Sequence, residues 1–141
     1  HRTVLVAGPY AARYQEQDDD LAGRLTVVRD VPGCVDLFAR AGAVVQMAGY
    51  NSTVESLAAG VRPVLVPRRS PRREQAIRAS RLAAMGLADV VDERAPADEV
   101  AWLLGRDRTL DPARVAAAGL RLDGAERAAA VLAALVGAGV S

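Results

Sequence analysis

The feature that most constrains the fold is a regular alternation of short apolar runs and helix-like segments. Five runs rich in β-branched and other apolar residues occur along the chain, and helix-like sequence follows each of them. They cover residues 3–7, 25–28, 43–46, 63–66 and 88–91. Runs without a polar face are typical of strands that helices cover on both sides. We therefore predict an α/β fold, a Rossmann-like three-layer sandwich around a parallel sheet.

Several helix boundaries can be predicted from local sequence. A start is expected where serine or aspartate can accept a backbone N–H bond, and an end where glycine can take a left-handed conformation. The first predicted helix covers residues 53–59, between Ser52 and Gly60, and the second runs from Ser70 and Pro71 to Gly86. A third starts at Asp111 and Pro112, and a fourth starts at a capping box over residues 123–126.

Composition excludes several classes of protein. The chain has 141 residues, of which 51% are hydrophobic and 25% charged, as in one soluble globular domain. Its net charge of +1 gives no general attraction to nucleic acid or anionic membrane. An RNA-binding surface built on its arginines would need stacking aromatic residues, and only 4% of the chain is aromatic.

The sequence also indicates the cellular compartment of the protein and whether the chain is part of a longer one. The single cysteine, Cys34, cannot form an internal disulfide, so we expect a cytoplasmic protein. The late apolar run at residues 128–136 is about half the length that crosses a bilayer, and we expect no transmembrane segment. Because the chain opens on His1 and enters a strand directly, we expect it to start inside a longer protein.

The most informative segment, residues 49–75, begins with a glycine turn that leads into a helix. Gly49 lets the backbone approach a ligand, and free N–H groups at a helix N-terminus attract an anion such as a diphosphate. Ser52 adds a hydroxyl donor, and Glu55 can accept hydrogen bonds from both hydroxyls of a ribose. In the alternative interpretation, Ser52 and Glu55 form a capping box that only satisfies the helix's own N–H groups.

The segment as a whole carries a longer pattern of glycine, polar and proline residues. Its members are Gly49, Tyr50, Asn51, Ser52, Glu55, Gly60, Pro63, Pro67, Glu74 and Gln75. This pattern resembles the donor-binding signature of GT-B glycosyltransferases, in the peptidoglycan GlcNAc transferase type and the UDP-glycosyltransferase type, in register over 27 residues without a gap. Residues 67–75 also look like a group of bacterial predicted glycosyltransferases.

The resemblance implies a role for each matching residue. The turn residues Gly49, Tyr50, Asn51 and Ser52 would contact the diphosphate, and Glu55 would bind the ribose. The Glu74 and Gln75 pair would reach the sugar hydroxyls, for which carboxylate and carboxamide groups supply acceptors and donors. Without the resemblance, Glu74 is equally well explained as a favourable charge at the start of a helix.

Three more positions are assigned through the same resemblance. Val31 aligns with the base-recognition loop, after the second strand, and is the expected uracil-facing residue. Gly8 aligns with a glycine loop that faces phosphate or acceptor. The loop arginines can neutralise a departing diphosphate or can simply be solvated, and they stand at positions 68, 69, 72 and 73. Of these four, Arg72 is the one that we expect to contact the donor. We expect no metal and no cofactor.

Two departures from the family and several residues without a role complete the sequence evidence. Met47 stands where plant-type members have a histidine, and their tryptophan-initiated base motif is missing, which puts the plant-type acceptor range in doubt. We assign no chemistry to His1 or to Cys34. The acidic residues 18–20 also receive no role, because an isolated acidic run is typical of a solvated loop.

The sequence thus predicts that residues 1–141 are the donor-binding, C-terminal half of a GT-B glycosyltransferase that uses a UDP-sugar. An N-terminal acceptor domain or a partner subunit, absent from this chain, would supply the general base and any peripheral contact with a membrane. The alternatives are a UDP-sugar hydrolase or 2-epimerase of the same superfamily and a non-catalytic nucleotide-binding module. The sugar, the acceptor and the stereochemistry of transfer stay open.

Overall fold

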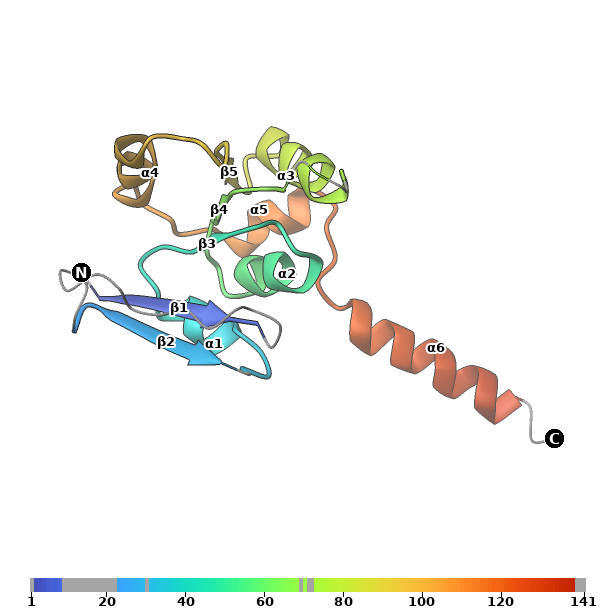
Figure 1. Cartoon of the computed structure of the whole chain (residues 1–141). Coiled ribbons are helices and arrows are strands. Elements are labelled where there is room, and N and C mark those ends of the chain that lie inside the picture. Colours follow the sequence, from blue (N-terminus) through green and yellow to red (C-terminus); the bar gives the residue numbers. More distant parts are fainter. Residues whose placement is uncertain (1, 9–22, 30, 69, 71–72, 139–141) are drawn as a thin grey trace. The chain divides into compact units, whose positions relative to one another are not determined.

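The computed structural model describes residues 2–8, 23–29, 31–68, 70 and 73–138. The chain divides into two compact units, His1–Cys34 and Val35–Ser141. All pairings between the described strands are parallel, and a helix follows each of the strands β2, β3, β4 and β5 (Figure 1). The predicted α/β, Rossmann-like class is confirmed.

The first unit contains a two-stranded sheet. Strand β1 (Thr3–Ala7) pairs in parallel with β2 (Leu25–Arg29), from Thr3 opposite Leu25 to Ala7 opposite Arg29. Both strands lie where the apolar runs predict them. Residues 3–6 of β1 are exposed within the described part of the chain, so covering of both faces remains a prediction for this strand. The helix predicted to follow β1 and the acidic residues 18–20 lie outside the described residues.

The second unit contains a three-stranded parallel sheet and six helices among the described residues. The sheet order is β3-β4-β5. The elements, in chain order, are α1 (Val35–Ala39), β3 (Val45–Gln46), α2 (Tyr50–Ala58), β4 (Val64–Leu65), α3 (Glu74–Ala84), β5 (Asp89–Val90), α4 (Ala97–Leu104), α5 (Pro112–Ala117) and α6 (Gly124–Ala138). The strands are shorter than the predicted runs, but each lies inside one.

Strand β4 forms the centre of this unit. It pairs with β3 on one side and β5 on the other, and both of its side chains are completely buried. Successive residues of a strand point to opposite faces. Leu65 packs in a cluster with residues of α2, α3 and α5, whereas Val64 packs with Leu103 of α4. Helices therefore cover both faces of this sheet, as the three-layer prediction requires.

Glycines end the helices in the predicted way. After α2, Gly60 takes a φ of +71°, its N–H donates to the Leu57 carbonyl at 3.1 Å, and the Val61 N–H donates to the Ser56 carbonyl at 3.0 Å. This pair of bonds is a Schellman motif, which satisfies the last carbonyls of a helix. Gly86 ends α3 with the same pair of bonds and a φ of +70°.

We expect the substitution Gly60→Ala to lower the free energy of unfolding by about 1–2 kcal/mol, because a left-handed conformation costs that much for a residue with a Cβ. The new Cβ would also lie 3.4 Å from the Leu110 carbonyl oxygen. Chemical denaturation checks this value, with Gly42→Ala as the control. Gly42 has open space around its Cβ position and no left-handed φ, so an equal loss in both variants would contradict the explanation.

The predicted starts of α2 and α3 need correction, whereas α6 begins at Gly124 as predicted and only its capping contact differs. Helix α2 begins at Tyr50 with Gly49 as its N-cap, so Ser52 lies inside the first turn and does not cap the helix. Helix α3 begins at Glu74 rather than at Ser70. At α6 the Asp123 carboxylate accepts two bonds from the Arg121 guanidinium, at 3.1 and 2.7 Å, in place of the predicted capping-box contact. The start of α5 is confirmed, since the Asp111 side chain accepts from the Ala113 N–H at 2.8 Å.

The last described helix, α6, is rich in alanine and carries exposed apolar side chains, including Leu132 and Leu135. In the described ranges, no helix combines the length and the apolar character that crossing a bilayer requires.

Candidate functional site

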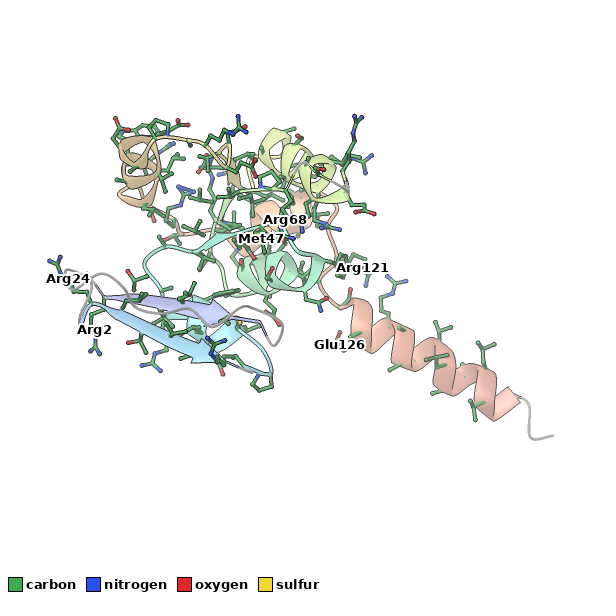
Figure 2. The ribbon with its side chains drawn as sticks, viewed as in Figure 1. Arg2, Arg24, Met47, Arg68, Arg121 and Glu126 are labelled. Carbon is green, nitrogen blue, oxygen red and sulfur yellow. The ribbon has the colours of Figure 1, made fainter. Side chains whose placement is uncertain are left out.

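Two helices of the second unit start at one edge of its sheet. Strands β3 and β4 are parallel neighbours, so the chain leaves both strands at the same edge. Met47 follows β3 and leads into α2, and Arg68 lies on the way from β4 to α3 (Figure 2). The carboxyl edge of a parallel sheet is where open α/β folds bind ligands. The glycine turn and the Glu74–Gln75 pair therefore both follow strands at the edge where a ligand is expected.

The start of α2 has the geometry of an anion site. Gly49 is extended, with φ −60° and ψ 149°, and no side chain caps the helix. The first bond of the helix runs from the Thr53 N–H to the Gly49 carbonyl at 3.1 Å. The N–H groups of Tyr50, Asn51 and Ser52 precede it and have no carbonyl one turn earlier within the helix. Such groups attract an anion, because they lie at the positive end of the helix dipole.

The capping-box interpretation of Ser52 and Glu55 is wrong. Ser52 is the third residue of α2 rather than its N-cap, and its hydroxyl donates to the Gly49 carbonyl at 3.4 Å. Glu55 lies in the second turn of α2, beyond the position that a capping box requires. Both side chains are half-buried. The ribose role of Glu55 remains a prediction.

A buried hydroxyl fixes α2 to the end of β3. The Ser56 hydroxyl donates to the Ser52 carbonyl at 2.8 Å and accepts from Gln46 Nε2 at 2.7 Å. Ser56 has no exposed surface. Because Gln46 is the last residue of β3, these two bonds set the position of the first turn of α2 relative to the sheet.

The predicted sugar-binding pair lies at the start of α3. Glu74 is the first residue of the helix and is exposed, and Gln75 is half-buried. Gln75 Oε1 accepts from the Arg68 N–H at 3.1 Å, which ties α3 to the loop after β4. Arg68 and Arg73 are exposed, whereas Arg69 and Arg72 lie outside the described residues.

Arg78, which the donor-like pattern of residues 49–75 does not include, links α3 to the glycine turn. Arg78 Nη1 donates to the Ala48 carbonyl at 2.6 Å, and its Cζ lies 5.6 Å from the centroid of the Tyr50 ring. The i,i+4 spacing from Glu74 could have identified it, since residues four apart share one face of a helix. The contact links α3, which begins at Glu74, to the backbone directly before Gly49.

The two predicted positions in the first unit follow its strands. Gly8 comes directly after β1 and is exposed, and Val31 comes two residues after the end of β2 and is half-buried. Since β1 and β2 are parallel, both residues lie beyond the carboxyl edge of that sheet. Their predicted contacts with phosphate and base remain predictions.

A groove of about 310 Å³ runs along α3. It is lined by Glu74, Ile77, Arg78, Arg81, Leu82, Met85 and Leu120. The groove shares Glu74 and Arg78 with the candidate site but does not include the glycine turn. We place the candidate site at the turn, because the helix N–H groups are there.

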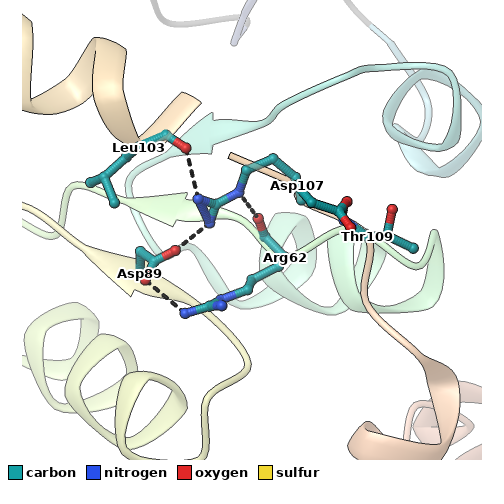
Figure 3. Close-up of polar contacts among 6 residues, drawn as sticks. Arg62, Asp89, Leu103, Asp107 and Thr109 are labelled. Carbon is teal, nitrogen blue, oxygen red and sulfur yellow. Dashed lines mark hydrogen bonds and ion pairs between the residues drawn. The ribbon is translucent and has the colours of Figure 1, made fainter. Parts of the chain in front are cut away.

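An arginine–aspartate network lies at the opposite edge of the sheet (Figure 3). Asp89, the first residue of β5, pairs with Arg62 at 2.8 Å and with Arg108. Arg108 also donates to the Arg62 carbonyl at 3.0 Å and to the Leu103 carbonyl at 2.9 Å. Arg108 is 4% exposed, and burial lowers the pKa of its guanidinium while Asp89 opposes that shift. The network joins the starts of β4 and β5 and serves the fold.

The network is not among the sequence predictions, although Asp89 gives one signal of it. Asp89 interrupts the apolar run at residues 88–91. A carboxylate in a buried strand needs a partner, because an unpaired buried charge is costly. The sequence indicates the need for a cation but not which arginine supplies it.

The fold and the shared starting edge of α2 and α3 define an α/β protein of the Rossmann-like class. The chain matches no protein-family model and no curated protein. It is similar to a crystal structure described as the glycotransferase of kitacinnamycin, with a TM-score of 0.64 and 22% sequence identity. The match covers 93% of this chain and 34% of that chain, so this chain spans about a third of its relative. The likeness establishes a fold that also occurs in a glycosyltransferase.

Proposed function

We propose that this chain is the donor-binding part of a GT-B glycosyltransferase and binds a nucleoside diphosphate sugar, with uracil as its base. The observation that carries the proposal is the contact between α3 and the glycine turn at the carboxyl edge of the sheet. It joins Ala48, directly before Gly49, to Arg78 on the helix that begins with Glu74 and Gln75, 30 residues further along the chain. The fold shared with a glycosyltransferase supports the same conclusion.

The proposed roles follow from the chemistry of each group. The N–H groups of Tyr50, Asn51 and Ser52 would bind the diphosphate, and the Glu55 carboxylate would accept from the ribose hydroxyls. Glu74 would accept from a sugar hydroxyl, and the Gln75 amide nitrogen would donate to one, since its oxygen already accepts from Arg68. Gly8 and Arg72 would add contacts to phosphate, and Val31 to the base.

Transfer would need groups outside this chain. A second domain or subunit would bind the acceptor and supply the general base, and would align the acceptor hydroxyl with the anomeric carbon. Helix N–H groups and arginine would stabilise the departing diphosphate without a metal ion. We therefore expect this chain alone to bind the donor without transferring its sugar.

Calorimetric titration of the chain with UDP, UDP-GlcNAc, UDP-glucose, a dTDP-sugar and a GDP-sugar tests the proposal. The buffer contains EDTA, so that binding without metal is measured. We expect the uridine nucleotides to bind selectively and uridine alone to bind more weakly, because it lacks the diphosphate that faces the helix dipole. Absence of binding by all five nucleotides would contradict the proposal for this chain.

A further inference from the structure

The residue before the glycine turn has an unusual backbone. Ala48 has a φ of +59°, and it is the only non-glycine residue with a positive φ in the described part of the chain. A Cβ makes this left-handed conformation unfavourable, so it persists only where surrounding contacts fix it. The Ala48 side chain is completely buried in the cluster that contains Leu57 and Leu65.

One guanidinium contacts the backbone before Gly49 and the side chain after it. Arg78 donates to the Ala48 carbonyl at 2.6 Å and lies 5.6 Å from the Tyr50 ring centroid. A hydrogen bond from a charged donor is stronger than one between neutral groups, and a cation over an aromatic ring adds attraction. Both contacts therefore act on the residues that flank Gly49, one of which is the strained Ala48.

We propose that Arg78 is a positioning residue that holds Ala48 in its left-handed conformation and thereby presents the N–H groups of α2 to the diphosphate. The diphosphate ligand in this inference rests on the proposed function. The effect of Arg78 on the backbone at Ala48 does not depend on that function. The guanidinium suits this role better than an ammonium, because its planar fork can donate along one direction while its face packs on a ring. A glycine at position 48 would adopt the same φ without this help.

A cycle of variants separates positioning from direct phosphate binding. Arg78→Met removes the guanidinium and keeps an apolar stem, and we expect it to weaken UDP binding about tenfold, the change that follows from losing one charged hydrogen bond. Ala48→Gly alone should bind UDP as the wild type does. In the Ala48→Gly background, the loss caused by Arg78→Met should shrink to about threefold or less, because the turn no longer carries strain.

Two results would overturn the binding part of the inference. An equal loss from Arg78→Met in both backgrounds would make Arg78 a direct phosphate ligand. An Arg78→Lys variant that binds UDP as well as the wild type would show that any nearby positive charge suffices. Arg81→Met is the matched control, since Arg81 lies on the same helix and is exposed, and it should leave UDP binding unchanged.

Hydrogen exchange of the free protein tests the structural part without a ligand. The Thr53 amide makes the first bond of α2, to the Gly49 carbonyl. We expect Arg78→Met to speed its exchange about tenfold and Arg81→Met to leave it unchanged, if one charged hydrogen bond holds the turn closed. Unchanged Thr53 exchange in Arg78→Met would reject the positioning role. Changed exchange in a chain that binds no nucleotide would instead retain that role and reject the proposed function.

Discussion

The substitution Asp89→Ala is expected to lower the free energy of unfolding by about 3–5 kcal/mol, the usual loss when one partner of a buried ion pair is removed. It would leave the buried Arg108 guanidinium without a carboxylate, and Arg62 would lose its ion pair as well. Such a loss is a large fraction of the stability of an ordinary domain. We therefore expect Asp89→Ala to be the most damaging single substitution of the network.

Denaturation followed by fluorescence measures this effect directly. The single tryptophan, Trp102, lies on α4, next to Leu103, whose carbonyl accepts from Arg108. Asp89→Asn keeps the size of the side chain and one acceptor oxygen, so its loss should be smaller than that of Asp89→Ala. Glu93→Ala is the control, because Glu93 is exposed shortly after β5. A midpoint for Asp89→Ala equal to that of Glu93→Ala would show that the network adds nothing to stability.

The parts of the fold that could be predicted from sequence are the local ones. The strands follow from runs of apolar residues, and β1 has the predicted bounds, Thr3–Ala7. Helix ends could be predicted because a left-handed glycine forms its bonds within the last turn, as at Gly60 and Gly86. The starts of the helices were less predictable than their ends. The N-cap at Gly49 depends on its backbone conformation, and a serine three residues later offered a plausible competitor.

The contacts that complete both edges of the sheet are not local. Arg78 and Ala48 are 30 residues apart, Arg62 and Asp89 are 27 apart, and Arg108 lies 46 residues beyond Arg62. The chain has 18 arginines, and their spacing does not reveal which of them meet a carbonyl or a carboxylate. The strain at Ala48 was equally hidden, because alanine ordinarily favours right-handed conformations. The sequence could thus predict the elements that carry the candidate site, but not the arginine that joins them.

Replacement of Glu55 by alanine is the substitution from which we expect the largest loss of nucleotide affinity. If the carboxylate accepts hydrogen bonds from both ribose hydroxyls, its removal should weaken UDP binding about 10- to 100-fold, at about 1.5–3 kcal/mol for a hydrogen bond to a charged group. Alanine is the best helix former, so α2 should persist. Circular dichroism and the unfolding midpoint check that it does.

Comparison of UDP with 2′-deoxy-UDP assigns that loss to the ribose. The wild-type chain should bind the deoxynucleotide about tenfold more weakly, because one bond to the carboxylate is missing. Glu55→Ala should bind both nucleotides equally, and Glu55→Gln should fall between, since an amide keeps one acceptor oxygen. A preference for UDP that survives in Glu55→Ala would place the ribose contact elsewhere. Glu55 would then act on the position of α2, half-buried in its second turn, rather than on the donor.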